Sequence, residues 1–193
     1  MQDADQKARV IQDLDEMESL ISLALNFARN DVDAGGDRAS VDLKRLLEQF
    51  VAALTTPSRV ALDVPAPVVV HCQELSIRRT LANVVDNALF YGRQVNIRLA
   101  ETADEAEILV DDDGPGIEPQ NRERVFTAFH RLEPSRSRET GGAGLGLTIA
   151  QTLVHSHGGT IRLLNSTLGG LQVRIALPKK SRSGGPPSSD PPP

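Results

Sequence analysis

Two asparagines lie four residues apart in residues 74–91, a stretch whose apolar residues recur at helical spacing. Asn83 and Asn87 therefore share one side of the expected helix, opposite its apolar face. Asparagine is a mediocre helix former because its amide competes with the backbone for hydrogen bonds. An amide oxygen suits Mg²⁺, and an amide NH₂ can donate to a phosphate. The pair predicts a phosphate and metal contact; an ordinary solvated helix face is the alternative interpretation.

A carboxylate followed by two glycines ends the next expected strand, at residues 112–116. Asp112 can accept a hydrogen bond from an exocyclic amine, such as that of adenine. Gly114 and Gly116 permit backbone angles closed to other residues and let a ligand come close. The alternative is an ordinary turn, because Asp-Gly and Pro-Gly are common turn pairs.

A glycine-rich stretch at residues 141–147 runs into another expected helix. Unobstructed N–H groups at a helix N-terminus form a phosphate site. The stretch is not a P-loop, because it lacks Gly-Lys-Ser/Thr, and no βαβ unit surrounds it as in a Rossmann turn. A flexible hinge is the alternative.

A basic, polar stretch at residues 131–138 lies between the aspartate and glycine motifs. It carries Arg131, Arg136 and Arg138. Guanidinium groups on a mobile segment can cover a phosphate tail. A solvated loop is the alternative.

The apolar pattern indicates alternating helices and paired strands. We expect helices at residues 5–29, 43–54, 74–91, 119–126 and 145–157, and strands at 60–64, 68–70, 94–101, 106–111, 160–165 and 171–177. Asp42 is the expected N-cap of the second helix, and Gly158 with Gly159 is expected to end the last one. Strands in adjacent pairs predict an α+β fold, with helices over one face of a mixed, largely antiparallel sheet.

Composition limits the function classes. The chain has 193 residues, of which 39% are hydrophobic, and a net charge of −5. Nucleic-acid binding is not expected, because the net charge is negative and no basic stripe stands out along the chain. The single cysteine, Cys72, excludes a disulfide framework and is expected to be buried. With no signal peptide and no run of roughly 18 apolar residues, we expect a soluble, cytoplasmic chain, whose longer parent could be anchored in the membrane.

The motifs together resemble the N, G1, F and G2 boxes of the GHKL ATPases. Within that superfamily, residues 81–88, 112–117, 125–129 and 142–147 are similar to the boxes of sensor histidine kinases, and the resemblance covers roughly residues 40–178. It implies a Bergerat-fold two-layer α/β sandwich, preceded by one long helix.

The resemblance also implies Mg²⁺-ATP as the ligand. Catalytic roles would belong to Asn87, which would coordinate Mg²⁺, and to Arg136, which would reach the γ-phosphate. Asn83 would support the phosphates, Asp112 would hold the adenine amine, and Tyr91 would line the base pocket. The other implied contacts are Gly114 and Gly116 at the base, Arg131 at the γ-phosphate, and Gly142, Gly144, Leu145 and Gly146 around the phosphate tail.

Two features depart from the family pattern. Phe90 stands where the family often has Lys or Arg, so one phosphate contact is missing or is supplied by Arg93. None of the four histidines has the family's phosphoacceptor context, and all are expected to be structural or exposed. They are His71, His130, His155 and His157.

The domain arrangement follows from the same resemblance. Residues 1–30 resemble the second helix of the dimerisation and phosphotransfer hairpin, residues 31–39 a linker, residues 40–178 the ATP-binding domain, and residues 179–193 a disordered tail. The helix that carries the acceptor histidine would then lie before residue 1.

The implied activity is transfer of the ATP γ-phosphoryl group to a histidine in two-component signalling. The implied partners are an acceptor hairpin of the same or another subunit, a response regulator, and a second copy through the first helix. The alternatives are an ATP-binding module without catalysis, a serine kinase of the anti-sigma-factor type, and a dimerising scaffold.

Overall fold

A five-stranded sheet forms the centre of the computed structural model, which describes residues 37–128 and 144–179. Its strand order is β2-β4-β5-β7-β6. The strands are β2 (Val60–Asp63), β4 (Val95–Glu101), β5 (Glu105–Asp112), β6 (Thr160–Asn165) and β7 (Leu171–Pro178). β2 pairs with β4 in parallel, and the other three pairings are antiparallel. The predicted mixed, largely antiparallel sheet is confirmed.

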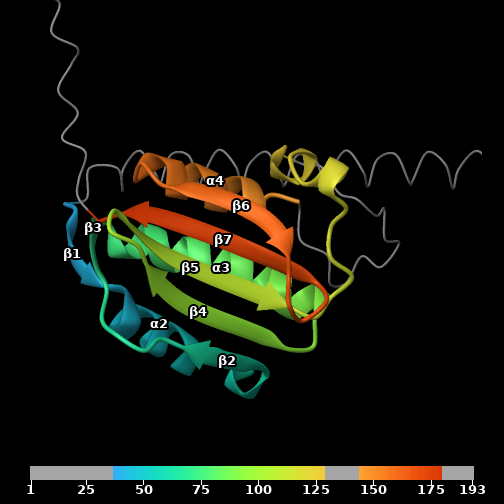
Figure 1. The fold of residues 1–193 in the computed structure, drawn as a ribbon, viewed down its shortest axis with the longest axis horizontal. Coiled ribbons are helices and arrows are strands. Elements are labelled where there is room, and N and C mark those ends of the chain that lie inside the picture. The colour runs from blue at the N-terminus through green and yellow to red at the C-terminus, as the bar shows by residue number, and fades with distance from the viewer. Residues whose placement is uncertain (1–36, 129–143, 180–193) are drawn as a thin grey trace, which may run out of the picture.

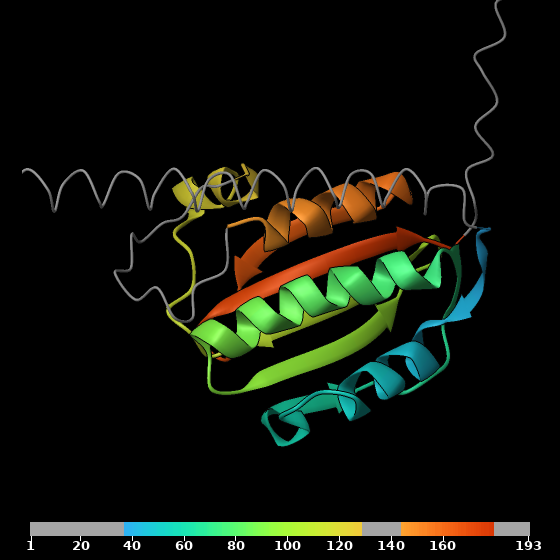
Figure 2. The ribbon, with the colours of Figure 1, turned by 180° about the vertical axis from the view of Figure 1, so that it is seen from behind.

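The helices lie on one face of this sheet, as predicted. They are α2 (Leu43–Ala52), α3 (Glu74–Tyr91) and α4 (Gly146–Ser156). Figure 1 shows the sheet in front of them, and Figure 2 shows the same helices from the opposite side. Alternate strand residues such as Ile97, Ile108 and Ile175 are buried against helix residues such as Leu81 and Val84. Removal of these side chains from water is the main force that holds the two layers together.

A second, two-stranded sheet was not predicted. β1 (Ala39–Asp42) pairs antiparallel with β3 (Val69–Cys72). The sequence assigned residue 39 to a linker and placed no strand there, because four residues give too short a pattern to recognise. At the other end, the Lys179 N–H donates to the Asp104 carbonyl at 2.9 Å, so this residue contacts the fold. Cys72 is buried as expected.

The expected helix over residues 119–126 is two short 3₁₀ helices, η2 (Pro119–Asn121) and η3 (Arg124–Phe126). Only Val125 is buried in them. Without a stripe of apolar residues to pack, the cost of nucleating a longer α-helix is not offset.

The ends of the three main helices follow local sequence signals. The Asp42 carboxylate accepts from the N–H groups of Lys44 and Arg45, which confirms the predicted cap of α2. α4 ends before Gly158, which has a φ of 72°, also as predicted. None of the described helices combines the length and apolar character needed to cross a bilayer.

Candidate functional site

The two asparagines of α3 face the start of α4. A Cβ placed on Gly146 would lie 3.4 Å from Asn83 Oδ1 and 3.5 Å from Asn87 Nδ2. Asn83 Nδ2 also donates to the Arg79 carbonyl at 2.9 Å. Both asparagines are partly buried. The interpretation of an ordinary solvated helix face is therefore wrong, because a second helix begins beside this one.

The glycine motif positions the first turn of α4. Gly144 has a φ of 72°, a conformation that residues with a Cβ rarely adopt. Leu145 follows as a buried residue, and the helix begins at Gly146. The first N–H groups of a helix have no acceptor within it, so the start of α4 can bind an anion. Thr148 Oγ1 donates to the Phe126 carbonyl at 2.9 Å and ties this turn to η3.

The third group of the predicted site is a buried carboxylate at the end of β5. Asp112 Oδ1 accepts from the Gly114 N–H at 2.9 Å and from the Leu171 N–H at 3.1 Å. Its Oδ2 accepts no hydrogen bond from the residues that the structure describes. Burial raises the pKa of this carboxyl. A carboxylate oxygen with remaining acceptor capacity, on a residue that is itself buried, is suited to a single N–H donor such as an exocyclic amine.

The β6–β7 turn contributes to this corner, which sequence reasoning missed. The Gly170 N–H donates to the Asp112 carbonyl at 3.2 Å. Any Cβ on Gly170 would collide with the Asp112 carboxylate, so glycine is required there for close approach. Gly116 meets the same residue, because its Cβ would lie 3.3 Å from the Gly170 carbonyl oxygen. The Gly169–Gly170 pair was read only as a strand connection, because its contact is about 60 residues away in sequence.

The C-terminal end of α3 brings the carboxylate close to the asparagines. A Cβ on Gly114 would lie 3.0 Å from the Tyr91 carbonyl oxygen, and a Cβ on Gly92 would lie 3.1 Å from Asp112 Cβ. Asn83 and Gly92 are separated by nine residues, or about 14 Å of helix at 1.5 Å per residue. The amides, the start of α4 and the buried carboxylate therefore all adjoin one stretch of α3.

Two aromatic rings are exposed at that end of the helix. The Phe90 and Tyr91 rings meet edge to face with centroids 4.8 Å apart, and the residues are 49% and 59% exposed. The Tyr91 backbone contacts the aspartate motif, and its role in lining a base pocket remains a prediction. Phe90 is exposed, and the loss of one phosphate contact there, or its replacement by Arg93, remains a prediction.

Several predicted site residues lie outside the described ranges. These are Arg131, Arg136, Arg138 and Gly142, together with His130. Of the other histidines, His71 and His155 are exposed. His157 is buried, with Nε2 accepting from the Gln73 N–H at 3.1 Å and Nδ1 lying 2.8 Å from the Leu153 carbonyl oxygen. These three therefore hold the structural or exposed positions that were expected.

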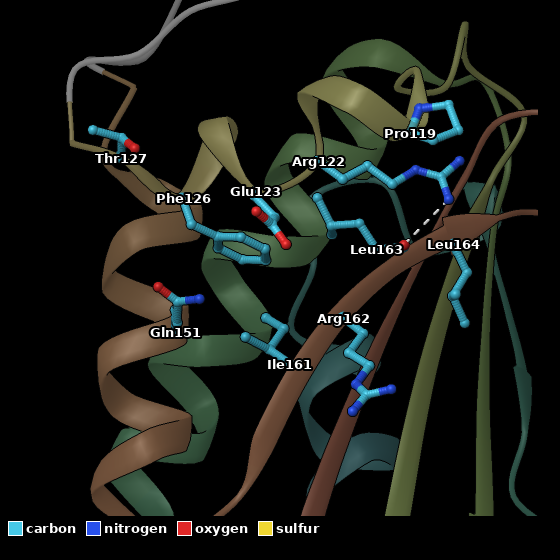
Figure 3. A pocket seen from close by; sticks show the side chains of 10 residues that line it. All are labelled: Pro119, Arg122, Glu123, Phe126, Thr127, Gln151, Ile161, Arg162, Leu163 and Leu164. Carbon is cyan, nitrogen blue, oxygen red and sulfur yellow. Dashed lines mark hydrogen bonds between the residues drawn. The ribbon is translucent and has the colours of Figure 1, made fainter.

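A separate cleft of about 700 Å³ lies beside η3, α4 and β6 (Figure 3). Phe126, Gln151 and Leu163 line it, and Arg122 donates across it to the Leu163 carbonyl. None of the predicted site residues lines this cleft. It shares only the η3 segment with the arrangement around α3, through the Thr148 contact with Phe126.

Comparison with known families and proteins agrees with this geometry. The sequence model of the family described as "Histidine kinase-, DNA gyrase B-, and HSP90-like ATPase" matches residues 72–181. Sensor histidine kinase GtrS of Pseudomonas aeruginosa is 36% identical over 168 residues, which are 87% of this chain and 34% of that protein. Sensor protein RstB of Escherichia coli is 37% identical over 174 residues, which are 86% of this chain and 40% of that protein. The chain thus spans well under half the length of these relatives.

Solved structures give the same result. The histidine kinase domain of the E. coli osmosensor EnvZ has 30% identity and a TM-score of 0.58, and the match covers 80% of this chain and 97% of that one. Full-length ShkA, solved in complex with AMPPNP, has 28% identity and a TM-score of 0.68, and the match covers 88% of this chain and 37% of that one.

The matched residues include α3, the Asp112 corner and the start of α4, which are the elements that the site geometry brings together. The family match covers more than half of the chain, GtrS is a sensor histidine kinase, and the EnvZ structure is the histidine kinase domain of an osmosensor. This chain belongs to the family of histidine kinase-, DNA gyrase B- and HSP90-like ATPases, and it is the ATP-binding domain of the sensor histidine kinase type.

Proposed function

We propose that this chain binds Mg²⁺-ATP beside α3 and passes the γ-phosphoryl group to a histidine on a phosphotransfer hairpin, in two-component signalling. The observation that carries the proposal is the convergence of Asp112, Asn87 and Gly146 on one stretch of α3. The complex of ShkA with AMPPNP, an ATP analogue, supports the ligand class.

The residues around α3 have the right chemistry for each part of the nucleotide. Asp112 Oδ2 would accept from the adenine amine, while Oδ1 is held by two backbone N–H groups. At the other end, the N–H groups that open α4 would meet the phosphates. Asn83 would donate to the same phosphates, and Asn87 would supply an amide oxygen to Mg²⁺.

The donor set fits Mg²⁺ rather than a metal held by protein alone. Within the described ranges, no three or more His, Cys, Asp or Glu side chains gather into a metal site. Mg²⁺ commonly takes one or two protein ligands and completes its shell with water and substrate phosphates. Bound there, Mg²⁺ would neutralise phosphate charge during phosphoryl transfer. Arg136, with Arg131 or Arg138, is proposed to approach the γ-phosphate.

The acceptor histidine is proposed to come from a hairpin of the same protein or a second subunit. His71 lies in β3 and His155 near the end of α4, so neither is placed at the face of α3 that carries Asn83 and Asn87. Both ring nitrogens of His157 lie within hydrogen-bonding distance of backbone groups. The similarity to GtrS extends over 168 residues, more than the 110 of the family match. It supports a proposed arrangement in which residues 1–30 are a hairpin helix, residues 31–39 a linker, residues 40–178 the catalytic domain and residues 179–193 a tail.

The partners and location of the whole protein are part of the same proposal. We expect a homodimer through residues 1–30, phosphoryl transfer onward to a response regulator, and a cytoplasmic position for this domain, with a membrane anchor in a longer parent.

Calorimetric titration of Mg²⁺-ATP tests the site. We expect Asn87→Ala to lose at least about tenfold in affinity, and to lose the difference between titrations with and without Mg²⁺, because a metal ligand is gone. Asp86→Asn is the matched control, since Asp86 is exposed on the neighbouring position of α3. Equal Mg²⁺ dependence in wild type and Asn87→Ala would exclude the metal role.

Labelled ATP tests the reaction. With an added hairpin fragment carrying an acceptor histidine, we expect acid-labile label on the fragment. Binding without any transfer would leave an ATP-binding module, and acid-stable label would indicate a serine kinase.

A further inference from the structure

The turn that follows α3 is held from one side by an arginine outside the four nucleotide motifs. Arg59 ends the 3₁₀ helix η1 (Pro57–Arg59) directly before β2. Its guanidinium donates to the carbonyls of Leu89 at 3.0 Å and Gly92 at 2.5 Å, and its Nε donates to the Arg93 carbonyl at 2.8 Å. A cation at a helix C-terminus also interacts favourably with the helix dipole.

The strand register explains why this arginine reaches the turn. β2 runs parallel to β4, with Val60 opposite Val95. The residue before β2 therefore lies beside the residues that lead into β4. A fork of five N–H donors can bind several carbonyls at once, which the ammonium group of a lysine does less rigidly.

The same turn is also held, through its N–H groups, by the second aspartate of the 112–116 motif. Asp113 Oδ1 accepts from the Arg93 N–H at 2.6 Å and from the Gln94 N–H at 2.9 Å. These bonds lower the pKa of the Asp113 carboxyl, which is therefore held as a carboxylate. Arg59 donates to the carbonyl groups of the turn, and Asp113 accepts from its N–H groups. Hydrogen bonds therefore fix both the acceptors and the donors of this backbone segment.

This turn between α3 and β4 defines the position of the Asp112 carboxylate relative to α3. A Cβ on Gly92 would lie 2.8 Å from Asp113 Oδ1 and 3.1 Å from Asp112 Cβ, so the turn is packed directly onto both aspartates. Gly114 is equally close to the Tyr91 carbonyl oxygen. A shift of the turn would therefore change the distance between Asp112 and the asparagines on α3.

We propose that Arg59 is a positioning residue for base recognition: by fixing the α3–β4 turn between its guanidinium and the Asp113 carboxylate, it sets Asp112 at the place where an adenine amine is read. This inference rests on the proposed nucleotide function. It adds a specificity determinant that lies 22 residues before the first motif, residues 81–88, and forms no part of that motif.

If Arg59 had a purely structural role, its loss would have a different effect on nucleotide binding. Loss of such a residue would lower the folded fraction and reduce the apparent affinity for every nucleotide by the same factor. A positioning residue changes the discrimination between bases while leaving the phosphate contacts in place. The ratio of two affinities separates these cases, because the folded fraction cancels.

The test compares binding of Mg²⁺-ATP, Mg²⁺-ITP and Mg²⁺-tripolyphosphate by calorimetry. Inosine carries a carbonyl in place of the exocyclic amine, and tripolyphosphate has no base. For Arg59→Ala we expect the ATP/ITP affinity ratio to fall about tenfold, equivalent to one misplaced hydrogen bond. Tripolyphosphate affinity should stay within about twofold once the folded fraction is measured by circular dichroism. Arg59→Lys should restore part of the ratio.

Two further variants keep the test decisive. Arg45→Ala removes an exposed arginine of α2 and should match wild type. Asp113→Ala removes the other half of the clamp at an exposed position and should lower the ATP/ITP ratio even if Arg59→Ala does not fold. A folded Arg59→Ala or Asp113→Ala protein with the wild-type ratio would overturn the inference. A wild-type protein that binds ATP no better than ITP would instead overturn the proposed role of Asp112.

Discussion

The two ends of the predicted nucleotide site are built in different ways. At the adenine end, Asp112 Oδ1 accepts two backbone N–H bonds, and Gly170 packs against the carboxylate with no room for a side chain. At the phosphate end, the space between Gly146 and the two asparagines would still admit a Cβ on Gly146 at ordinary contact distance, and amide groups and helix N–H groups are the polar atoms there. The first end is fixed by the fold, and the second leaves polar groups ready for a ligand.

This difference implies that stability and binding are coupled at one end only. A change that adds bulk at the adenine end must disturb β7 and the loop after β5 together, because the Asp112 carboxylate accepts from the Leu171 and Gly114 N–H groups. A change at the phosphate end removes a side-chain contact while leaving the packing intact. Substitutions should therefore sort into two classes, and the following experiments test that division.

The largest effect is expected from Gly170→Ala. Its Cβ would collide with the Asp112 carboxylate and the Gly114 N–H, and overpacking of this kind costs about 1–3 kcal/mol of unfolding free energy. Thermal and denaturant unfolding should show this loss, and calorimetry should show weakened ATP binding. Gly146→Ala is the matched variant: its Cβ has room at 3.4 Å, and alanine favours a helix by about 0.5–1 kcal/mol. Equal destabilisation by both changes would contradict the division.

Asp112→Asn should separate binding from stability at the adenine end. The amide can keep the bonds to Gly114 and Leu171 through Oδ1, but it offers a donor instead of an acceptor to the adenine amine. We expect ATP affinity to fall about 10- to 100-fold, the range for a hydrogen bond to a charged group. Inosine, which has an acceptor at that position, should be affected less.

The sign of the stability change in Asp112→Asn follows from the raised pKa. Because burial raises the pKa of Asp112 above 3.8, its charged form costs the folded state free energy at neutral pH. The asparagine variant should be as stable as wild type or more stable at pH 7, and any gain should vanish as pH falls below 3.8, where both states hold the proton. Asp104→Asn, in the exposed β4–β5 turn, is the control. A marked loss of stability at pH 7 would show that the carboxylate is needed for folding.

The smallest effect is expected from protonation of His157, which lies between the start of α3 and the end of α4. Burial lowers the pKa of His157, and the nearby Arg38 adds to this effect. His157 therefore binds a proton more readily in the unfolded chain than in the folded chain. The stability that neutral His157 contributes is present above pH 6.5 and is lost as pH falls below it. In the range down to about pH 5, His157→Gln should therefore lose less unfolding free energy than wild type. His155→Gln, which changes an exposed neighbour, should behave like wild type.

Much of the fold was predictable because its signals are local. The helix at residues 74–91 was predicted with the bounds that α3 has, since its apolar face, its length and the following glycine all agree. The β4–β5 and β6–β7 hairpins follow from alternating apolar residues and short turns. The cap at Asp42 and the stop at Gly158 depend on neighbouring residues only.

The missed features depend on contacts between distant segments. β1 exists as a strand because β3 pairs with it, and its four residues carry no pattern of their own. The contact between Gly170 and Asp112 depends on the pairing of β5 with β7. Arg59 reaches Leu89 and Gly92 only because β2 adds in parallel to β4.

The sequence by itself determined the chemical groups of this protein, their order along the chain and the elements that carry them, because capping, turn formation and apolar periodicity act over a few residues. Only the tertiary structure decided that the asparagines face another helix, that a β-hairpin turn closes on Asp112, and that Arg59 binds the turn after α3. These contacts join residues that are 30 to 63 positions apart, and sheet pairing and helix packing bring such residues together by burying apolar surface that no single segment can bury alone.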